Sequence, residues 1–333
     1  MEFLRIFFTL SLFLFLSCFN RQLIAPNDKY RHDVQDDVNS IIFIGDTQKT
    51  NSLQIFSEKN IGIQDSLFKQ IAIECPDLII HLGDIVESGS SKSDWIKFDT
   101  FSKYVDWSST SFMSILGNHE YYGHNKQALA NFFSRFKYFK KNQTWFSFIV
   151  NGLGIILINS NKDNMKIEEL NYQLNWFNNK IDEFDSLNSV DHIIIVSHHP
   201  PYTNMKVKYF KNSLPFIDKK ERDNYYLREN YVQKYLKSKK AALFISGHTH
   251  SYEHFIIDEK HFIVSGGGGA PRDPISLDGD YHDIYNGPSI RNFNYCKLIK
   301  NDNYWTFEMI ELTKYKKWRS GERFVINKDF TNK

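Results

Sequence analysis

The sequence has few cysteines, almost no net charge and no apolar run long enough to span a membrane. Only 3 of its 333 residues are cysteine, and none of them forms a C-x-x-C pair, which excludes a zinc site built from thiolates. The formal net charge of +2 is too close to zero to indicate nucleic acid or an anionic membrane as the main partner. Internal repeats and long low-complexity tracts are also missing. The rest of the composition, 41% hydrophobic and 24% charged, is that of an ordinary globular protein with a sizeable core.

The longest apolar run lies at the amino terminus, at residues 6–16, directly behind Arg5. It is shorter than the ~20 apolar residues that a membrane-spanning helix needs, and it has the layout of a secretory signal. Cys18 follows almost at once, as at the cleavage site of bacterial lipoproteins, so we expect residues 1–17 to be a signal peptide and Cys18 to carry a lipid. An uncleaved anchor is the alternative. Either way we expect an exported, membrane-anchored protein that faces the periplasm or the cell surface.

One large domain is expected over residues 40–312, between two segments without a periodic apolar pattern. Residues 18–39 are polar and typical of a tether, and residues 313–333 are basic and expected to form a loose tail. Cys75 and Cys296 are compatible with a disulfide and equally with two free thiols, because sequence spacing does not decide between them.

Short apolar runs of the kind that form buried strands alternate with amphipathic helical patterns along the domain. Strands are predicted at residues 41–44, 78–82, 112–116, 193–197, 243–246, 295–298 and 305–311, helices at 63–75, 95–105, 128–136, 170–184 and 225–236, and hairpins at 145–159 and 255–264. Strand–helix–strand units of this length form parallel crossovers. We therefore predict an α/β fold of the αββα type, with two mixed sheets packed face to face, helices on the outer faces and a site at the strand ends.

Five of these strands are followed directly by residues with metal-binding side chains. They are Asp46 and Gln48, Asp84, Asn118 and His119, His198 and His199, and His248 and His250. Ligands of α/β folds bind beyond the carboxyl ends of the strands, where these residues are expected to lie. One polar residue at a strand end is common, but five such ends are difficult to explain by packing.

The type and number of these side chains indicate a dinuclear metal site. Imidazoles with carboxylate or amide oxygens, and without thiolates, suit manganese, iron or zinc. There are too many candidate ligands for one tetrahedral ion, so we expect two ions, with Asp84 lending one oxygen to each. Two metal ions ~3.5–4 Å apart can bind a phosphoryl oxygen and lower the pKa of a water between them. That is the chemistry of phosphoester hydrolysis.

These motifs resemble those of the calcineurin-like metallophosphoesterases, and they occur in the same order. The matching blocks are Gly45-Asp46, Gly83-Asp84, Gly117-Asn118-His119-Glu120, His198-His199-Pro200-Pro201 and Gly247-His248-Thr249-His250. Residues 247–254, with the sequence GHTHSYEH, and the glycine-rich residues 265–270 are most similar to the purple acid phosphatase branch. The resemblance extends over residues 41–312.

The resemblance implies a role for each matching residue. Asp84 would bridge the two metals, Asp46 and His250 would complete the first site, and Asn118, His198 and His248 would complete the second. His119 would contact substrate or donate a proton to the leaving group, and His199 would touch substrate or pack. Apart from the resemblance, Glu120 and Tyr121 are expected to shape the loop, with contact to substrate as the alternative. A metal-bridging hydroxide would attack a phosphomonoester in line, as in an acid-phosphatase-like hydrolase acting on a phosphorylated small molecule.

Two positions depart from the family pattern. Gln48 stands where the wider family has a metal-binding histidine, so a weaker amide ligand is expected there. Glu87 stands three residues after Asp84, where the purple branch has an iron-binding tyrosine, so we expect no stable ferric site and no purple colour.

The ligand set alone leaves other functions open. A phosphodiesterase or a nucleotide pyrophosphatase would use the same metals, and residues 203–222, a basic stretch beside the site, are expected either to select substrate or to form a solvated surface loop. The alternative from another class is an exported binding protein without activity. His81, His192, His254 and His261 are interpreted as structural histidines.

Overall fold

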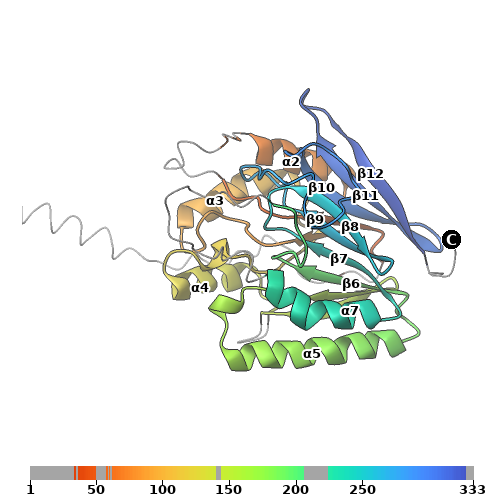
Figure 1. Ribbon diagram of the computed structural model, residues 1–333. Helices are drawn as coiled ribbons and strands as arrows, with labels where there is room; N and C mark the ends of the chain where they lie inside the picture. Colours follow the sequence, from red (N-terminus) through yellow and green to blue (C-terminus); the bar gives the residue numbers. More distant parts are fainter. Residues whose placement is uncertain are drawn as a thin grey trace, which may run out of the picture.

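The structure is a computed structural model that describes residues 34, 37–49, 58, 60, 62–139, 144–205 and 224–327. In this part of the chain, two sheets of six strands each pack face to face, with helices on their outer faces (Figure 1). The predicted αββα architecture is therefore confirmed.

The first sheet has the strand order β12-β11-β10-β1-β2-β3. Its strands are β1 (Ser40–Ile44), β2 (Leu78–His81), β3 (Ser111–Ser114), β10 (Phe293–Lys300), β11 (Tyr304–Leu312) and β12 (Trp318–Asn327). β1, β2 and β3 are parallel, whereas β10, β11 and β12 are joined by antiparallel pairing. Because parallel strands run the same way, the loops after β1, β2 and β3 leave the sheet at one edge.

The second sheet has the order β4-β5-β6-β7-β9-β8. Its strands are β4 (Phe146–Val150), β5 (Leu153–Leu157), β6 (His192–Ser197), β7 (Ala241–Ser246), β8 (Tyr252–Ile257) and β9 (Lys260–Ser265). β5, β6, β7 and β9 are parallel. The two predicted hairpins are present as β4–β5 and β8–β9.

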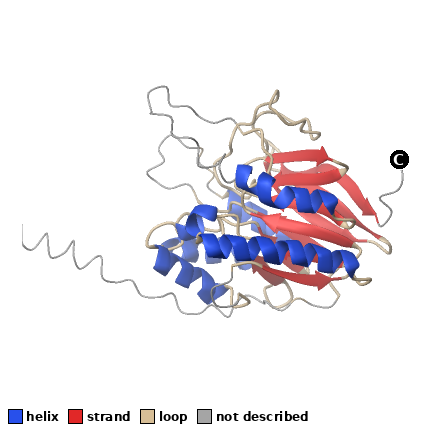
Figure 2. Ribbon diagram, turned by 60° about the horizontal axis from the view of Figure 1, so that its bottom comes forward, coloured by secondary structure: helices blue, strands red, loops and turns tan. Residues whose placement is uncertain are grey.

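Three apolar clusters hold the four layers together. The inner cluster lies between the sheets, and the two outer clusters lie under the helices. The helices over the first sheet are α2 (Ile63–Glu74), α3 (Lys92–Phe101) and α4 (Asn125–Arg135), and those over the second are α5 (Ile167–Ser186), η4 (Arg228–Val232) and α7 (Gln233–Lys237) (Figure 2). Short 3₁₀ turns are η1 (Ser102–Tyr104), η2 (His119–Tyr121) and η3 (Lys162–Asn164). In β1, Ile41 and Phe43 join the inner cluster while Ile42 and Ile44 join an outer one, as the alternation of a strand requires.

The carboxyl-terminal region differs from the prediction of a loose tail. Residues 318–327 form β12, which pairs with β11 along its length. Only Phe324 and Ile326 of this strand pack on the inner cluster, and charged residues such as Arg319 and Arg323 lie between its apolar ones. The apolar pattern was therefore too weak to predict a strand that is held mainly by its pairing with β11.

Several predictions fall on other parts of the chain. Residues 1–33 with Cys18, most of the 18–39 tether, and residues 206–223 and 328–333 lie outside the described residues. Within the described ranges, no helix has the length and apolar composition needed to cross a membrane. Cys75 is exposed at the end of α2 and Cys296 is buried in β10, and both are free thiols.

Candidate metal centre

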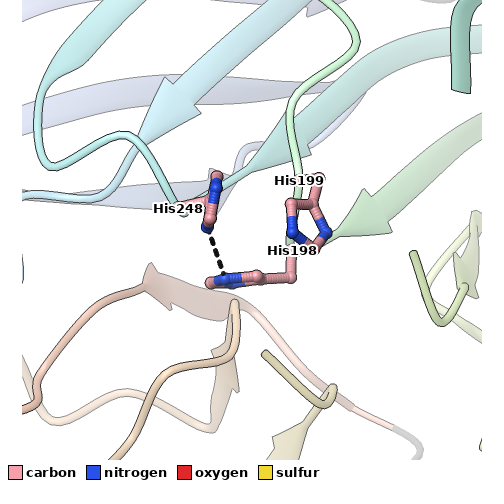
Figure 3. Close-up of side chains that lie close together, drawn as sticks. All are labelled: His198, His199 and His248. Atoms are coloured by element: carbon pink, nitrogen blue, oxygen red, sulfur yellow. Dashed lines mark hydrogen bonds between the residues drawn. The ribbon is translucent and has the colours of Figure 1, made fainter. Parts of the chain in front are cut away.

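The loops after β1, β2, β3, β6 and β7 meet at one edge of the two sheets. Their residues are connected by hydrogen bonds, ion-pair contacts and ring contacts. Every predicted site residue belongs to the group: Asp46, Gln48, Asp84, Asn118, His119, His198, His199, His248 and His250. Sequence reasoning thus assembled the correct set of neighbours. Figure 3 shows the three histidines contributed by the second sheet.

The backbone at this edge is strained. Asp46, Asp84 and His248 adopt left-handed conformations, with φ of 60°, 56° and 68°. Such conformations cost roughly 1–3 kcal/mol at non-glycine residues and are concentrated at functional sites. The backbone of two neighbouring glycines also lies close to these carboxylates. A Cβ at Gly117 would lie 2.1 Å from Asp84 Oδ1, and one at Gly247 would lie 2.5 Å from Asp46 Oδ2. Both positions therefore require glycine, because a side chain there would collide with a carboxylate oxygen.

Glu120 holds the strained loop around Asp84. Its buried carboxylate accepts hydrogen bonds from the backbone N–H groups of Asp84 and Ile85, both at 2.8 Å, of Gly117 at 2.7 Å and of Val86 at 3.4 Å. Burial, together with the nearby charge of Asp84, raises the pKa of Glu120 to about 7. Four backbone donors converging on one buried side chain confirm that Glu120 shapes the loop.

Asp84 presents one oxygen to both halves of the site. Its Oδ1 accepts a hydrogen bond from the backbone N–H of His119 at 2.9 Å. Its Oδ2 lies 3.3 Å from His198 Nε2 on one side and 3.5 Å from Gln48 Nε2 on the other. Oδ2 is therefore the oxygen of Asp84 that faces side chains from both halves of the site.

Asp46 and His250 face each other in the first half of the site. Asp46 Oδ2 accepts a hydrogen bond from the backbone N–H of His248 at 2.9 Å, and its Oδ1 lies 3.5 Å from His250 Nε2. His250 Nδ1 lies 2.7 Å from the carbonyl oxygen of Pro271, which can only accept, so Nδ1 carries the proton. Nε2 of His250 therefore keeps the lone pair that a metal ligand needs.

His198 is the centre of the second half. Its Nδ1–H donates to the carbonyl oxygen of Leu82 at 2.8 Å, while its Nε2 lies 3.0 Å from His248 Nδ1 and 3.1 Å from Asn118 Oδ1. Burial alone would lower the pKa of His198, but the charge and hydrogen bond of Asp84 raise it to about 9. A proton on His198 Nε2 thus lies among atoms that can accept it, Asn118 Oδ1, His248 Nδ1 and Asp84 Oδ2, whose lone pairs would otherwise repel each other. This nitrogen and oxygen donor set fits a divalent cation, which would take the place of that proton.

Gln48 is positioned to add an amide ligand to the first half. The side chain is buried, and its Nε2 lies 3.2 Å from His250 Nε2. Its Oε1 is also buried, with no hydrogen-bond partner among the described residues. Rotating the amide by half a turn exchanges the two atoms, so the carbonyl oxygen can face a cation beside His250.

His119 is more exposed than His198 and Asp84, which lie beside it in the site. Its Nδ1–H donates to the carbonyl oxygen of Glu87 at 2.7 Å, and its Nε2 lies 3.8 Å from Asp84 Oδ2. The ring packs on Tyr122, with 4.4 Å between ring centroids. The Tyr122 hydroxyl accepts a hydrogen bond from Asn118 Nδ2 at 2.9 Å. Tyr122 was not among the predicted site residues, and only its position after the Gly-Asn-His-Glu motif could have suggested it.

The remaining supports of the site have no sequence signal. Ser160 lies 2.9 Å from His199 Nδ1, and two backbone carbonyls, those of Leu82 and Pro271, orient His198 and His250. A backbone carbonyl acts through its position and not through the residue type. Sequence reasoning could not have identified these contacts.

Comparisons with known proteins agree with this geometry. A family model for the calcineurin-like phosphoesterases matches residues 40–252. A search of the curated proteins finds no match to the chain.

Solved structures of low sequence identity share the fold. Purple acid phosphatase PPD1 from yellow lupin (Lupinus luteus) seeds superposes with a TM-score of 0.64 and 17% sequence identity. The match covers 89% of this chain and 55% of the lupin chain, so this chain spans about half the length of the lupin protein. GAP50, described as the anchor in the inner membrane complex of Plasmodium, superposes with a TM-score of 0.59 and 17% sequence identity. The match covers 87% of this chain and 88% of GAP50. A dimetal phosphatase from Danio rerio superposes with a TM-score of 0.52 and 15% sequence identity. The match covers 88% of this chain and 100% of the Danio rerio chain.

Proposed function

The chain belongs to the calcineurin-like phosphoesterase family, and on that premise we propose that it hydrolyses phosphomonoesters with the help of two bound metal ions. The observation that carries this proposal is the position of Asp84 Oδ2, which lies within 3.5 Å of side chains from both halves of the site. A carboxylate oxygen in this position is suited to bridge two cations. The proposal covers the substrate class as well as the metals, and each part has its own test.

The ligands divide between two ions. Asp46, Asp84 and His250, with Gln48, would hold the first, and Asp84, Asn118, His198 and His248 would hold the second. Oxygen and imidazole donors of this kind suit manganese, iron or zinc. When bound, such a pair of ions neutralises charge on phosphoryl oxygens and lowers the pKa of water at the site.

His119 would supply the proton for the leaving group. The carbonyl of Glu87 fixes Nδ1 as a donor, which leaves Nε2 directed into the site near Asp84. A proton held at Nε2 can pass to the oxygen of the departing alcohol. No serine, cysteine or aspartate lies in a nucleophile motif, so we propose direct in-line attack of water on phosphorus without a covalent enzyme intermediate.

The first experiment removes all metal with a chelator and restores manganese, iron or zinc one at a time. We expect hydrolysis of a chromogenic phosphomonoester to return with metal, and to exceed hydrolysis of the matching diester. A higher rate with the diester or with a nucleotide pyrophosphate would replace the proposed substrate class. Full metal binding with no turnover of any ester would favour a binding protein instead.

A second experiment tests the direct attack. Hydrolysis of a phosphorothioate ester that is chiral at phosphorus should invert the configuration, because a single in-line displacement inverts it. Retention would require two displacements, and therefore a covalent intermediate.

We also propose that the protein is exported and tethered to a membrane through a lipid on Cys18, so that it meets substrates outside the cytosol. The support is the apolar run at residues 6–16 followed by Cys18. Wild-type protein should incorporate labelled fatty acid and fractionate with membranes. Cys18→Ser should do neither, and labelling of this variant would contradict the proposal.

A further inference from the structure

We propose that His199 is a third imidazole ligand of the metal ion that His198 and His248 would hold. The inference rests on the metal centre proposed above and extends it, because the family pattern in this sequence gives His199 no metal-binding role. Its basis is the way in which the three rings are grouped and the way in which the His199 ring is oriented.

The three imidazoles form one buried cluster. One nitrogen from each of His198, His199 and His248 lies within 4.8 Å of the others, which is close enough to share an ion. The His199 ring centroid is 4.2 Å from that of His248 and 4.9 Å from that of His198. In Figure 3 the His199 ring turns one nitrogen towards the other two side chains.

Ser160 fixes the His199 ring in an orientation suited to a ligand. The Ser160 hydroxyl oxygen lies 2.9 Å from His199 Nδ1 and accepts a hydrogen bond from the backbone N–H of His199 at 3.0 Å. A hydroxyl oxygen has two lone pairs and can accept both bonds. In the tautomer whose Nδ1–H donates to Ser160, His199 keeps a lone pair on Nε2. Metal-binding histidines are oriented in the same way, by donating their other N–H to a neighbouring oxygen.

A third imidazole would make the two metal sites chemically different. The second site would have three imidazole nitrogens, the Asn118 amide and the shared Asp84 oxygen. The first site would have only one imidazole, from His250, and would otherwise be built from oxygen ligands. Imidazole-rich sites suit zinc, cobalt or iron, whereas carboxylate-rich sites suit manganese or magnesium. The second site should therefore bind cobalt more tightly than the first.

The test is a titration of the metal-free full chain with Co²⁺, which reports affinity and, by visible absorption, the ligands of the ion. His199→Ala should weaken the tighter site by at least about tenfold and change the absorption spectrum of its Co²⁺. His199→Leu, which fills more of the space and has no lone pair, should do the same. Ser160→Ala should weaken binding by a smaller factor. The control is His282→Ala, which removes an exposed histidine from a loop and should bind Co²⁺ as the wild type does.

The opposite results are equally clear. If the folded His199→Ala or His199→Leu protein binds Co²⁺ with wild-type affinity and spectrum, the inference is wrong. If only Ser160→Ala folds, an unchanged affinity and spectrum in that variant would overturn it. His248→Ala separates this inference from the proposed function. An undiminished Co²⁺ content in His248→Ala would overturn the metal centre itself, whereas loss there without loss in the His199 variants would overturn only the role of His199.

Discussion

Glu120 and Asp84 are joined through the backbone: the Glu120 carboxylate accepts the N–H of Asp84 at 2.8 Å, while the Asp84 side chain points the other way, towards His198. The buried Glu120 carboxylate therefore holds the main chain from which the side chain of Asp84 extends. The left-handed conformation of Asp84, with φ of 56°, depends on this support.

Glu120→Ala should leave four backbone N–H groups buried without their side-chain acceptor. Since each such group costs about 1–3 kcal/mol, we expect the free energy of unfolding of the metal-free protein to fall by about 3 kcal/mol or more, and the metal content to fall with it. Glu120→Gln keeps one carbonyl oxygen and should lose less. Urea unfolding and metal analysis measure both effects. Glu229→Ala, at an exposed glutamate, is the control, and equal stability of the two alanine variants would refute the role of Glu120.

Asp84→Asn should lose more metal and more activity than any other single ligand substitution, because the Asp84 side chain faces both halves of the site. Gln48→Ala should lose less, since a neutral amide is a weak ligand. Metal per chain and turnover are measured in the same preparations. If Gln48→Ala lost as much metal as Asp84→Asn, our ranking of the ligands would be wrong.

His119→Ala should keep its metals and lose turnover by about 100- to 10,000-fold, the usual contribution of a general acid. The loss should be smallest with leaving groups that depart without a proton, such as nitrophenolate. Rates across a series of leaving groups measure this dependence. A uniform loss across the series would indicate that His119 binds substrate and does not protonate the leaving group.

The protein loaded with ferric iron should be colourless in the range of tyrosinate charge transfer, because Glu87 occupies the position of the expected tyrosine. Glu87→Tyr should introduce the band, as visible absorption will show. A purple wild-type protein would contradict the prediction and indicate that Tyr122, whose hydroxyl contacts Asn118, binds the metal instead.

His261 should make the fold sensitive to acid. Burial, together with the neighbouring His254, lowers the pKa of His261 from 6.5 to about 4. Between these values the unfolded chain binds a proton that the folded chain does not, so the free energy of unfolding should fall as pH drops from 6.5 towards 4. His261→Gln should remove about 1–3 kcal/mol of that fall.

Urea unfolding of the metal-free protein at several pH values from 7 to 4 measures the effect. His282→Gln, at an exposed histidine, should behave as the wild type. Parallel pH profiles for wild type and His261→Gln would show that His261 is not the acid-sensitive group.

The sequence alone was enough to predict the architecture and to predict which residues lie together at the site. Runs such as residues 41–44 and 193–197 are short, apolar on both faces and rich in isoleucine, which favours buried strands. The polar residues that follow such strands are expected to come together where parallel strands end. This is why Asp46 and His248, which are 202 positions apart, could be predicted as neighbours. The periodicity that identifies such strands is missing from β12, whose position depends on pairing with β11.

Only the tertiary structure decided how each side chain is used. Strand-end residues are local in sequence, but the atoms that orient them belong to other loops: the carbonyl of Leu82 sets the tautomer of His198, and that of Pro271 sets the tautomer of His250. The same holds for Asp84: its Oδ1 accepts a hydrogen bond from the backbone N–H of His119, and its Oδ2 faces His198 and Gln48. Main-chain donors and acceptors are alike in every residue. Their influence therefore depends on distance and direction, which are set only when the two sheets pack together.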